Sequence, residues 1–155
     1  MSPESKLAEL GYPVRLPPVA PPRPYEPLVQ VGSIVYGSGN TSIDRHAGTV
    51  YAGQVGGDVD LEHAREYARI AMVNALGGLK AHLGELSRVE RFVRVTGYVN
   101  SHPSFTQQAD VMNAASDLLV AAFGDAGRHA RSAIGVAQLP GGAAVEVEVI
   151  VEVTS

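Results

Sequence analysis

The clearest pattern of hydrophobic and polar positions lies at the C-terminal end of the chain, in residues 131–153. Two strand-like runs flank a Leu-Pro-Gly-Gly turn at 139–142. Successive side chains of a strand point to opposite faces, so the second run has one face of valines and one that is mostly glutamate. The apolar face predicts a layer of helices packed against it. The valines are Val145, Val147, Val149, Val151 and Val153, and the opposite face carries Glu146, Glu148, Ile150 and Glu152.

Two upstream segments repeat apolar residues at helical spacing. The first begins after Asp60, a capping residue, and ends at Gly84. The second runs from about 105 to 123 and stops at Gly124. A glycine pair at 77–78 inside the first helix favours close packing against a strand. The apolar stripes that we expect to face the sheet are Ala64, Tyr67, Ala68, Ala71, Ala75, Leu79 and Leu83 in the first helix, and Val111, Ala115, Leu118 and Ala122 in the second.

The remaining strands are shorter. Residues 28–39 contain two apolar runs about a Gly-Ser pair at 32–33, which predicts a tight hairpin. Residues 49–55 are another strand candidate. Residues 91–99 alternate strongly, and strict alternation places Val93, Val95 and Val99 on one face.

The N-terminal part of the chain has a different character. Residues 1–11 fit a short helix with a glycine stop at Gly11. Residues 12–27 are rich in proline, which fixes the backbone and removes a hydrogen-bond donor. They therefore predict an extended arm that lies over a surface of this chain or of a neighbour.

Together these elements predict one α/β (α+β) domain over residues 1–155, with a mixed β-sheet and two helices packed on one face. The other face of the sheet is then left uncovered. Besides the glutamates, it is expected to carry Ile150, Tyr98 and Phe92. A half-apolar open face indicates an oligomer in which sheets close on one another.

Composition narrows the possible functions. The formal net charge of −4 argues against a protein that binds nucleic acid through bulk electrostatics. The absence of cysteine excludes disulfides, thiolate metal sites and a cysteine nucleophile. The first ten residues lack the pattern of a signal peptide, and no apolar stretch approaches the roughly 20 residues of a membrane span. We therefore expect a cytoplasmic protein without membrane contact.

The residues themselves leave the chemistry open. The five histidines are scattered without ligand spacing, so we expect no metal site. Arg131 begins a strand after a polar loop and could be a surface charge or an anion ligand. Asn113 lies off the buried stripe of its helix and reads as an exposed polar residue. Tyr25, in the proline arm, reads as an anchor that pins the arm.

A resemblance to a known family adds to this picture. Residues 130–140 and 145–148 resemble the closing signature of the Rid, or YjgF-like, reactive-intermediate deaminases, also called the L-PSP endoribonuclease family. That signature is A-R-S-x-x-x-V-A-x-L-P followed by an E-x-E strand. Upstream, Ser38-Gly39 is similar to the small-residue pair after the family's second strand. The likeness spans about residues 25–153, whereas residues 1–24 look particular to a divergent branch.

The resemblance implies a chorismate-mutase-like fold and a homotrimer with ligand clefts between subunits. It also implies cofactor-independent hydrolysis of enamine or imine acids, such as 2-aminoacrylate and 2-iminobutanoate, to 2-keto acids and ammonia. Arg131 matches the arginine that holds the substrate carboxylate, and Glu146 matches the glutamate that positions or activates water. Tyr25, Ser38, Gly39, Asn113 and Ala133 match positions that line the cleft.

Two alternatives remain beside the deaminase: a trimer that binds a small carboxylate without turnover, and an endoribonuclease. The sequence also departs from the family pattern, with Ala133 in place of a common cysteine and Gly135 in place of an acidic residue. If residues 131–153 form a simple hairpin, Arg131 lies roughly 20 Å from Glu146 at strand rise. We therefore expect a neighbouring subunit to supply one of the two.

Overall fold

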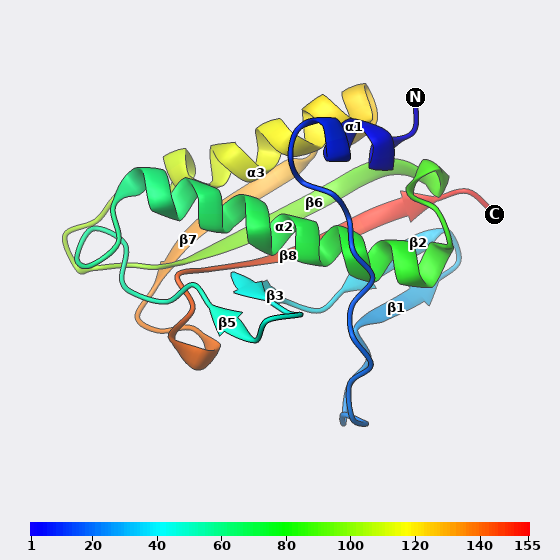
Figure 1. Cartoon of the computed structure of the whole chain (residues 1–155). Helices are drawn as coiled ribbons and strands as arrows, with labels where there is room; N and C mark the ends of the chain where they lie inside the picture. Colours follow the sequence, from blue (N-terminus) through cyan, green and yellow to red (C-terminus); the bar gives the residue numbers. More distant parts are fainter.

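The computed structural model describes all 155 residues as a sheet covered on one face by helices (Figure 1). The main sheet has the strand order β1-β2-β8-β6-β7, and the short β3 pairs with β8 beyond the end of β2. β4 and β5 form a separate small hairpin. The elements are α1 (Pro3–Glu9), β1 (Leu28–Val31), β2 (Ile34–Gly37), β3 (Asn40–Thr41), β4 (Ile43–Asp44), β5 (Thr49–Val50), α2 (Leu61–Leu83), β6 (Val89–Asn100), α3 (Gln108–Phe123), β7 (Ala130–Val136) and β8 (Val145–Val153).

The helices form where the sequence predicts them. Asp60 caps α2 by accepting a hydrogen bond from the backbone N–H of His63, and Gly84 ends the helix with a positive φ of 87°. The predicted stripes of both helices are buried, apart from the half-buried Tyr67. Only the predicted start of α3 is wrong: the helix begins at Gln108, and the Gln108 side chain donates to the carbonyl of Phe105 in the preceding loop.

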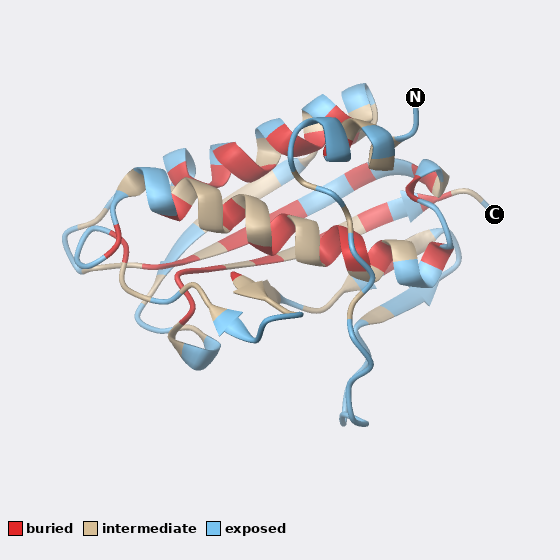
Figure 2. Cartoon of the chain, viewed as in Figure 1, coloured by how far each residue is buried: buried red, intermediate tan, exposed pale blue.

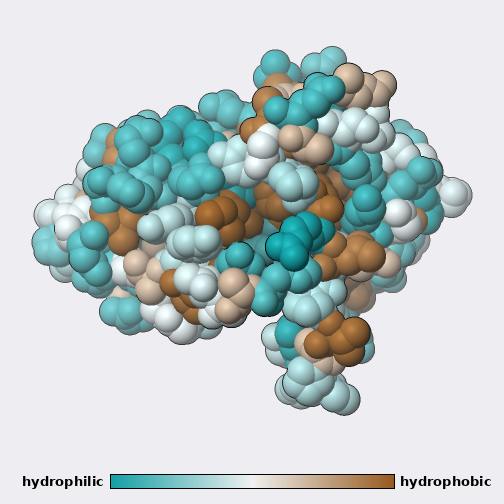
Figure 3. Space-filling model, in the orientation of Figure 1, coloured by the Kyte–Doolittle hydropathy of each residue, from teal (hydrophilic) through white to brown (hydrophobic).

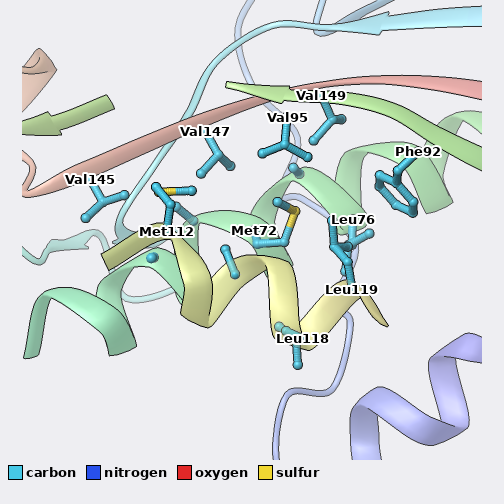
Figure 4. Packing of buried hydrophobic residues seen from close by; sticks show 14 of the residues in the cluster. Met72, Leu76, Phe92, Val95, Met112, Leu118, Leu119, Val145, Val147 and Val149 are labelled. Atoms are coloured by element: carbon cyan, nitrogen blue, oxygen red, sulfur yellow. The ribbon is translucent and has the colours of Figure 1, made fainter. Parts of the chain in front are cut away.

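The core lies between the helices and one face of the sheet (Figures 2 and 4). The five valines of β8 all point into it, as predicted, and are at most 2% exposed. Figure 4 shows Val145, Val147 and Val149 facing Met72 and Met112 of the two helices. Burial of each such side chain contributes about 1.5–3 kcal/mol relative to exposure.

The C-terminal segment does not form the simple hairpin considered above. β6 lies between β7 and β8, pairing parallel with β7 and antiparallel with β8. The crossover β6–α3–β7 explains this order, because such a connection returns the chain parallel to and beside the strand that it left. β7 is therefore an edge strand, and β8 runs on the opposite side of β6.

The alternation predicted for β6 is also broken. Its pairing with β8 shifts register between Val89 and Arg91 and again between Phe92 and Arg94. An extra residue in a strand turns the following side chains to the other face. Phe92 is consequently fully buried against Phe123, and Val93 is 39% exposed, the reverse of the prediction.

This inversion gives a test by equilibrium urea unfolding. Phe92→Ala is expected to lower the free energy of unfolding by about 3–5 kcal/mol, because it leaves a cavity in the core. Val93→Ala, the matched control, is expected to change it by no more than about 0.5 kcal/mol. Equal losses at both positions would contradict the bulged register.

Residues 12–27 form the predicted arm without regular structure, and it crosses α2 (Figure 1). Gly77 makes room for it, since a Cβ there would lie 2.5 Å from the carbonyl oxygen of Arg15. The predicted packing of this glycine against a strand is therefore wrong. Figure 3 shows the arm projecting from the body of the molecule, with hydrophobic surface near its tip. The strand predicted over 49–55 is also reduced, to the two residues of β5.

The second face of the sheet carries no helix, as predicted. Strand pairing places Val29 and Tyr36 on this face with Ile150 of β8. Val31 and Ile134 share the same face, and these side chains, Ile150 excepted, are 42–66% exposed. Tyr98 donates a hydrogen bond to Glu148 across the face at 2.7 Å, and this bond raises the pKa of Tyr98 to about 12.

Candidate functional site

A cavity of about 800 Å³ lies between the proline arm, the β2–β3 connection and β8. Four residues expected at the site line it: Tyr25, Ser38, Gly39 and Glu146. The arm therefore forms one wall, although its sequence departs most from the family pattern. Ser38 fixes the end of the arm, because its hydroxyl donates to the carbonyl of Glu26 at 2.7 Å and its backbone N–H donates to that of Pro27 at 2.8 Å.

Glu146 is one of two acidic residues that line this cavity, the other being Glu26 of the arm. It stands on the open face of the sheet, paired with Thr41 of β3 and Tyr98 of β6. Its carboxylate lies against Gly39, where an added Cβ would overlap an oxygen of the carboxylate. Only glycine fits at position 39 without displacing Glu146. Burial, and secondarily the charge of Glu148, raises the pKa of Glu146, which is the direction expected of an acid–base group.

Tyr25 does not anchor the arm. Its side chain is 54% exposed, and its hydroxyl accepts a hydrogen bond only from Arg23, at 3.4 Å. The guanidinium of Arg23 lies 5.7 Å from the centre of the tyrosine ring, a cation–π arrangement. Tyr25 therefore presents its ring and hydroxyl at the cavity, and Ser38 supplies the anchoring contacts.

Arg131 lies elsewhere. It pairs with Val95, so its side chain points to the helix side of the sheet. One guanidinium nitrogen donates to the side-chain oxygens of Asn113 and Ser116 at 2.9 and 3.1 Å. A second nitrogen donates to the carbonyl of Ala109 at 3.5 Å. Asn113 is thus a partner of Arg131 rather than an isolated polar residue.

The surroundings of Arg131 include a histidine that sequence reasoning did not select. His129 contacts the carbonyl of Gly127 through Nδ1 at 2.7 Å and the hydroxyl of Ser116 through Nε2 at 3.0 Å. Burial, together with the nearby Arg131, lowers the pKa of His129. A neutral ring with its proton on Nδ1 satisfies both contacts, so Ser116 donates to His129 and accepts from Arg131. This network holds the guanidinium at the edge of the sheet.

The expected site is therefore split into two groups within one chain. Tyr25, Ser38, Gly39 and Glu146 share the cavity, whereas Arg131, Asn113 and Ala133 belong to the β7 edge. Arg131 is aligned through β6 with Val149, two strands and three residues away from Glu146. Their Cα atoms are roughly 14 Å apart at standard strand spacing and rise, with side chains on opposite faces.

Two arginines in the cavity were missed by sequence reasoning. Arg45, in the β4–β5 hairpin, donates to the side-chain oxygen of Asn40, and the amide of Asn40 donates to the carbonyl of Ser38 at 3.0 Å. Arg23, on the arm, lines the same cavity. Burial, and then the charge of Arg23, lowers the pKa of Arg45. In the sequence Arg45 is a single charge in a polar turn and Arg23 is a single charge in the proline-rich arm, so no spacing signals them.

No group of three or more His, Asp or Glu side chains in the structure could hold a metal ion. None of the helices combines the length and apolar character needed to cross a bilayer. The cavity is lined by the half-buried carboxyl of Glu146, the exposed carboxyl of Glu26, two guanidinium groups and a phenol.

Comparison with known proteins shows the family to which this chain belongs. Residues 4–153 match the sequence model of a family described as "YjgF/chorismate_mutase-like, putative endoribonuclease". The chain belongs to the YjgF/chorismate mutase-like family. Protein TCP17 of Trypanosoma cruzi is 40% identical over 153 residues, covering 97% of this chain and 94% of TCP17. The fold and family expected from the closing signature are therefore confirmed.

Solved structures agree with this YjgF-like assignment. The crystal structure of Atu1372 from Agrobacterium tumefaciens, a protein of unknown function, is 38% identical, has a TM-score of 0.90, and covers 99% of this chain and 94% of Atu1372. E. coli TdcF, solved with bound serine, is 22% identical with a TM-score of 0.62, covering 91% and 94% of the two chains. The second likeness shows a shared fold.

Proposed function

We propose that this YjgF-like protein hydrolyses reactive enamine and imine acids to 2-keto acids and ammonia without a cofactor. The observation that carries the proposal is the desolvated carboxyl of Glu146 on the wall of a cavity large enough for a small acid. An imine is electrophilic at carbon, so hydrolysis needs a base for water and an anchor for the substrate. An enamine reaches the same imine by tautomerisation.

Glu146 acts as the base in this proposal. Its carboxylate takes a proton from water as the water oxygen bonds to the carbon of the protonated imine, giving a neutral carbinolamine. Glu146 returns this proton to the nitrogen and then accepts the hydroxyl proton as the C–N bond breaks, which leaves the 2-keto acid and ammonia. The last proton passes to ammonia, which departs as ammonium. A pKa raised above its ordinary value suits a group that takes up and returns protons during the cycle.

Arg131 holds the substrate carboxylate, and a neighbouring subunit brings it to the cavity. Within one chain it lies on the opposite face of the sheet from Glu146. Its strand, β7, is an edge strand, and the open face beside it exposes Val29, Tyr36 and Ile134. In a homotrimer this face would be covered, and each β7 edge would lie against the cavity of the next subunit. The exposed apolar surface and the division of the site within one chain both support this arrangement.

A second candidate is a binding protein that senses or carries a small carboxylate without turnover. The serine bound to TdcF is a ligand of the same chemical class. The two candidates share the cavity and differ only in whether Glu146 performs chemistry.

The test follows keto-acid and ammonia release from freshly generated 2-iminobutanoate. The wild-type protein is expected to accelerate release over the spontaneous rate by at least about 100-fold, the lower range for general base catalysis. Thermal stabilisation by 2-oxobutanoate without acceleration would support the binding protein instead. RNA cleavage that survives purification and is abolished by Glu146→Gln would overturn both in favour of an endoribonuclease.

A further inference from the structure

The cavity contains two arginines that the proposed hydrolysis does not use. Arg45 and Arg23 line it together with Tyr25, on segments unrelated to the strand that carries Glu146. Arg23 lies over the ring of Tyr25, 5.7 Å from its centre, and its charge helps to lower the pKa of Arg45. Two guanidinium groups converging on one cavity form a candidate anion site.

Arg45 lacks a counter-charge within the chain. It is half-buried, and its side-chain hydrogen bond goes to the neutral amide oxygen of Asn40. The ion pairs of the protein involve other residues, so no carboxylate lies within 4.0 Å of Arg45 or Arg23. A desolvated charge without a partner is costly, and a bound anion would offset that cost.

The two carboxylates that line the cavity, Glu146 and Glu26, form no ion pair with either arginine. The carboxylate of Glu146 lies against Gly39, whereas Arg45 donates to the side chain of Asn40. The cavity thus offers a proton-transfer group and two guanidinium groups that it does not neutralise.

We propose that Arg45 and Arg23 select ligands with a second acidic group, so that the preferred substrates are 2-imino dicarboxylic acids. The proposal rests on the proposed function: the carboxylate beside the imine goes to Arg131 of a neighbour, and the distal carboxylate goes to Arg45 and Arg23. Guanidinium binds carboxylate through paired, charge-assisted hydrogen bonds. The cavity of about 800 Å³ also has room for a longer acid than 2-iminobutanoate.

Binding of the stable keto acids tests this subsite without turnover. Calorimetric titration is expected to give 2-oxoglutarate a Kd about 10- to 100-fold lower than that of 2-oxobutanoate, the worth of one hydrogen-bonded charge pair. Arg45→Gln keeps a donor for Asn40 but removes the charge, and is expected to bring the ratio of the two Kd values close to one. Arg128→Gln, the matched control, removes an exposed arginine that pairs with Asp125.

Each outcome separates the two proposals. Equal affinities for both acids in the wild type, or an unchanged ratio in Arg45→Gln, would overturn the dicarboxylate subsite while leaving hydrolysis of 2-iminobutanoate intact. Preference for 2-oxoglutarate without hydrolysis of any imine would keep the subsite and overturn the deaminase. If Arg45→Gln does not fold, Arg23→Gln on the exposed arm gives the same comparison, and an unchanged ratio there counts against the subsite.

Discussion

Glu146→Gln is expected to lower the rate of imine hydrolysis by about 10²- to 10⁴-fold, the usual contribution of a general acid or base. Glutamine has nearly the same shape as glutamate, so it fits the space beside Gly39 but cannot take a proton from water. In the wild type the rate should rise with pH through the raised pKa of Glu146, because the carboxylate is the active form. The variant should lack that limb of the pH profile.

Glu146→Gln is expected to raise the stability of the protein at neutral pH, although it lowers the rate. Because burial raises the folded-state pKa of Glu146 above its ordinary 4.5, the stability contributed by its proton is present at low pH. It is lost as the pH rises through the folded-state pKa. Glutamine suffers no such loss, so Glu146→Gln should melt at a higher temperature than the wild type at neutral pH, and the difference should vanish in acid.

Glu152→Gln is the matched control for both effects, since Glu152 lies on the same face of β8 but is exposed. It should change neither the rate nor the melting temperature by a measurable amount. Full activity in Glu146→Gln would remove Glu146 from the chemistry. A lower melting temperature with lost activity would indicate a structural role instead.

The elements of the fold were predictable because each depends on local physics. The valine alternation of β8 and the caps of α2 at Asp60 and Gly84 depend only on residues that are close together in the sequence. The errors occurred where non-local packing decides. The register shifts in β6 depend on its partner strand, and the arm rather than a strand occupies the space over Gly77.

In the candidate site, too, the residues that were missed are those that only non-local packing brings together. The family resemblance selected the Ser-Gly pair and Glu146, and the structure brings Gly39 and Glu146 into contact at the cavity. Arg45 and Arg23 were not predictable, because only the folding of the arm and the β4–β5 hairpin brings them to the cavity. Ser116 and His129 likewise depend on how α3 lies beside β7. Long-range juxtaposition of single charged residues leaves no periodic signal in a sequence.

Arg131→Ala and Glu146→Gln are each expected to be inactive alone and to recover activity when mixed. Arg131 and Glu146 lie on opposite faces of one chain, so the proposed cleft takes one residue from each of two subunits. After co-refolding at a 1:1 ratio, a cleft is intact when the subunit that supplies Arg131 is the Glu146→Gln variant and the subunit that supplies Glu146 is the Arg131→Ala variant. Random assembly into a closed ring gives about one quarter of the wild-type activity per site.

A second mixture distinguishes a site shared between subunits from a complete site within each chain. Wild type co-refolded with the double variant Arg131→Ala/Glu146→Gln should retain about one quarter of the activity if the site is shared, and about one half if each chain holds a complete site, by the same random assembly. No recovery in the first mixture, together with one half in the second, would place both residues in one chain. That result would require Arg131 to leave Asn113 and Ser116 and pass around the β7 edge, which the 2.9 and 3.1 Å hydrogen bonds to α3 oppose. Recovery would instead make oligomer assembly a condition of catalysis, with the α3 contacts holding the guanidinium for the neighbouring cavity.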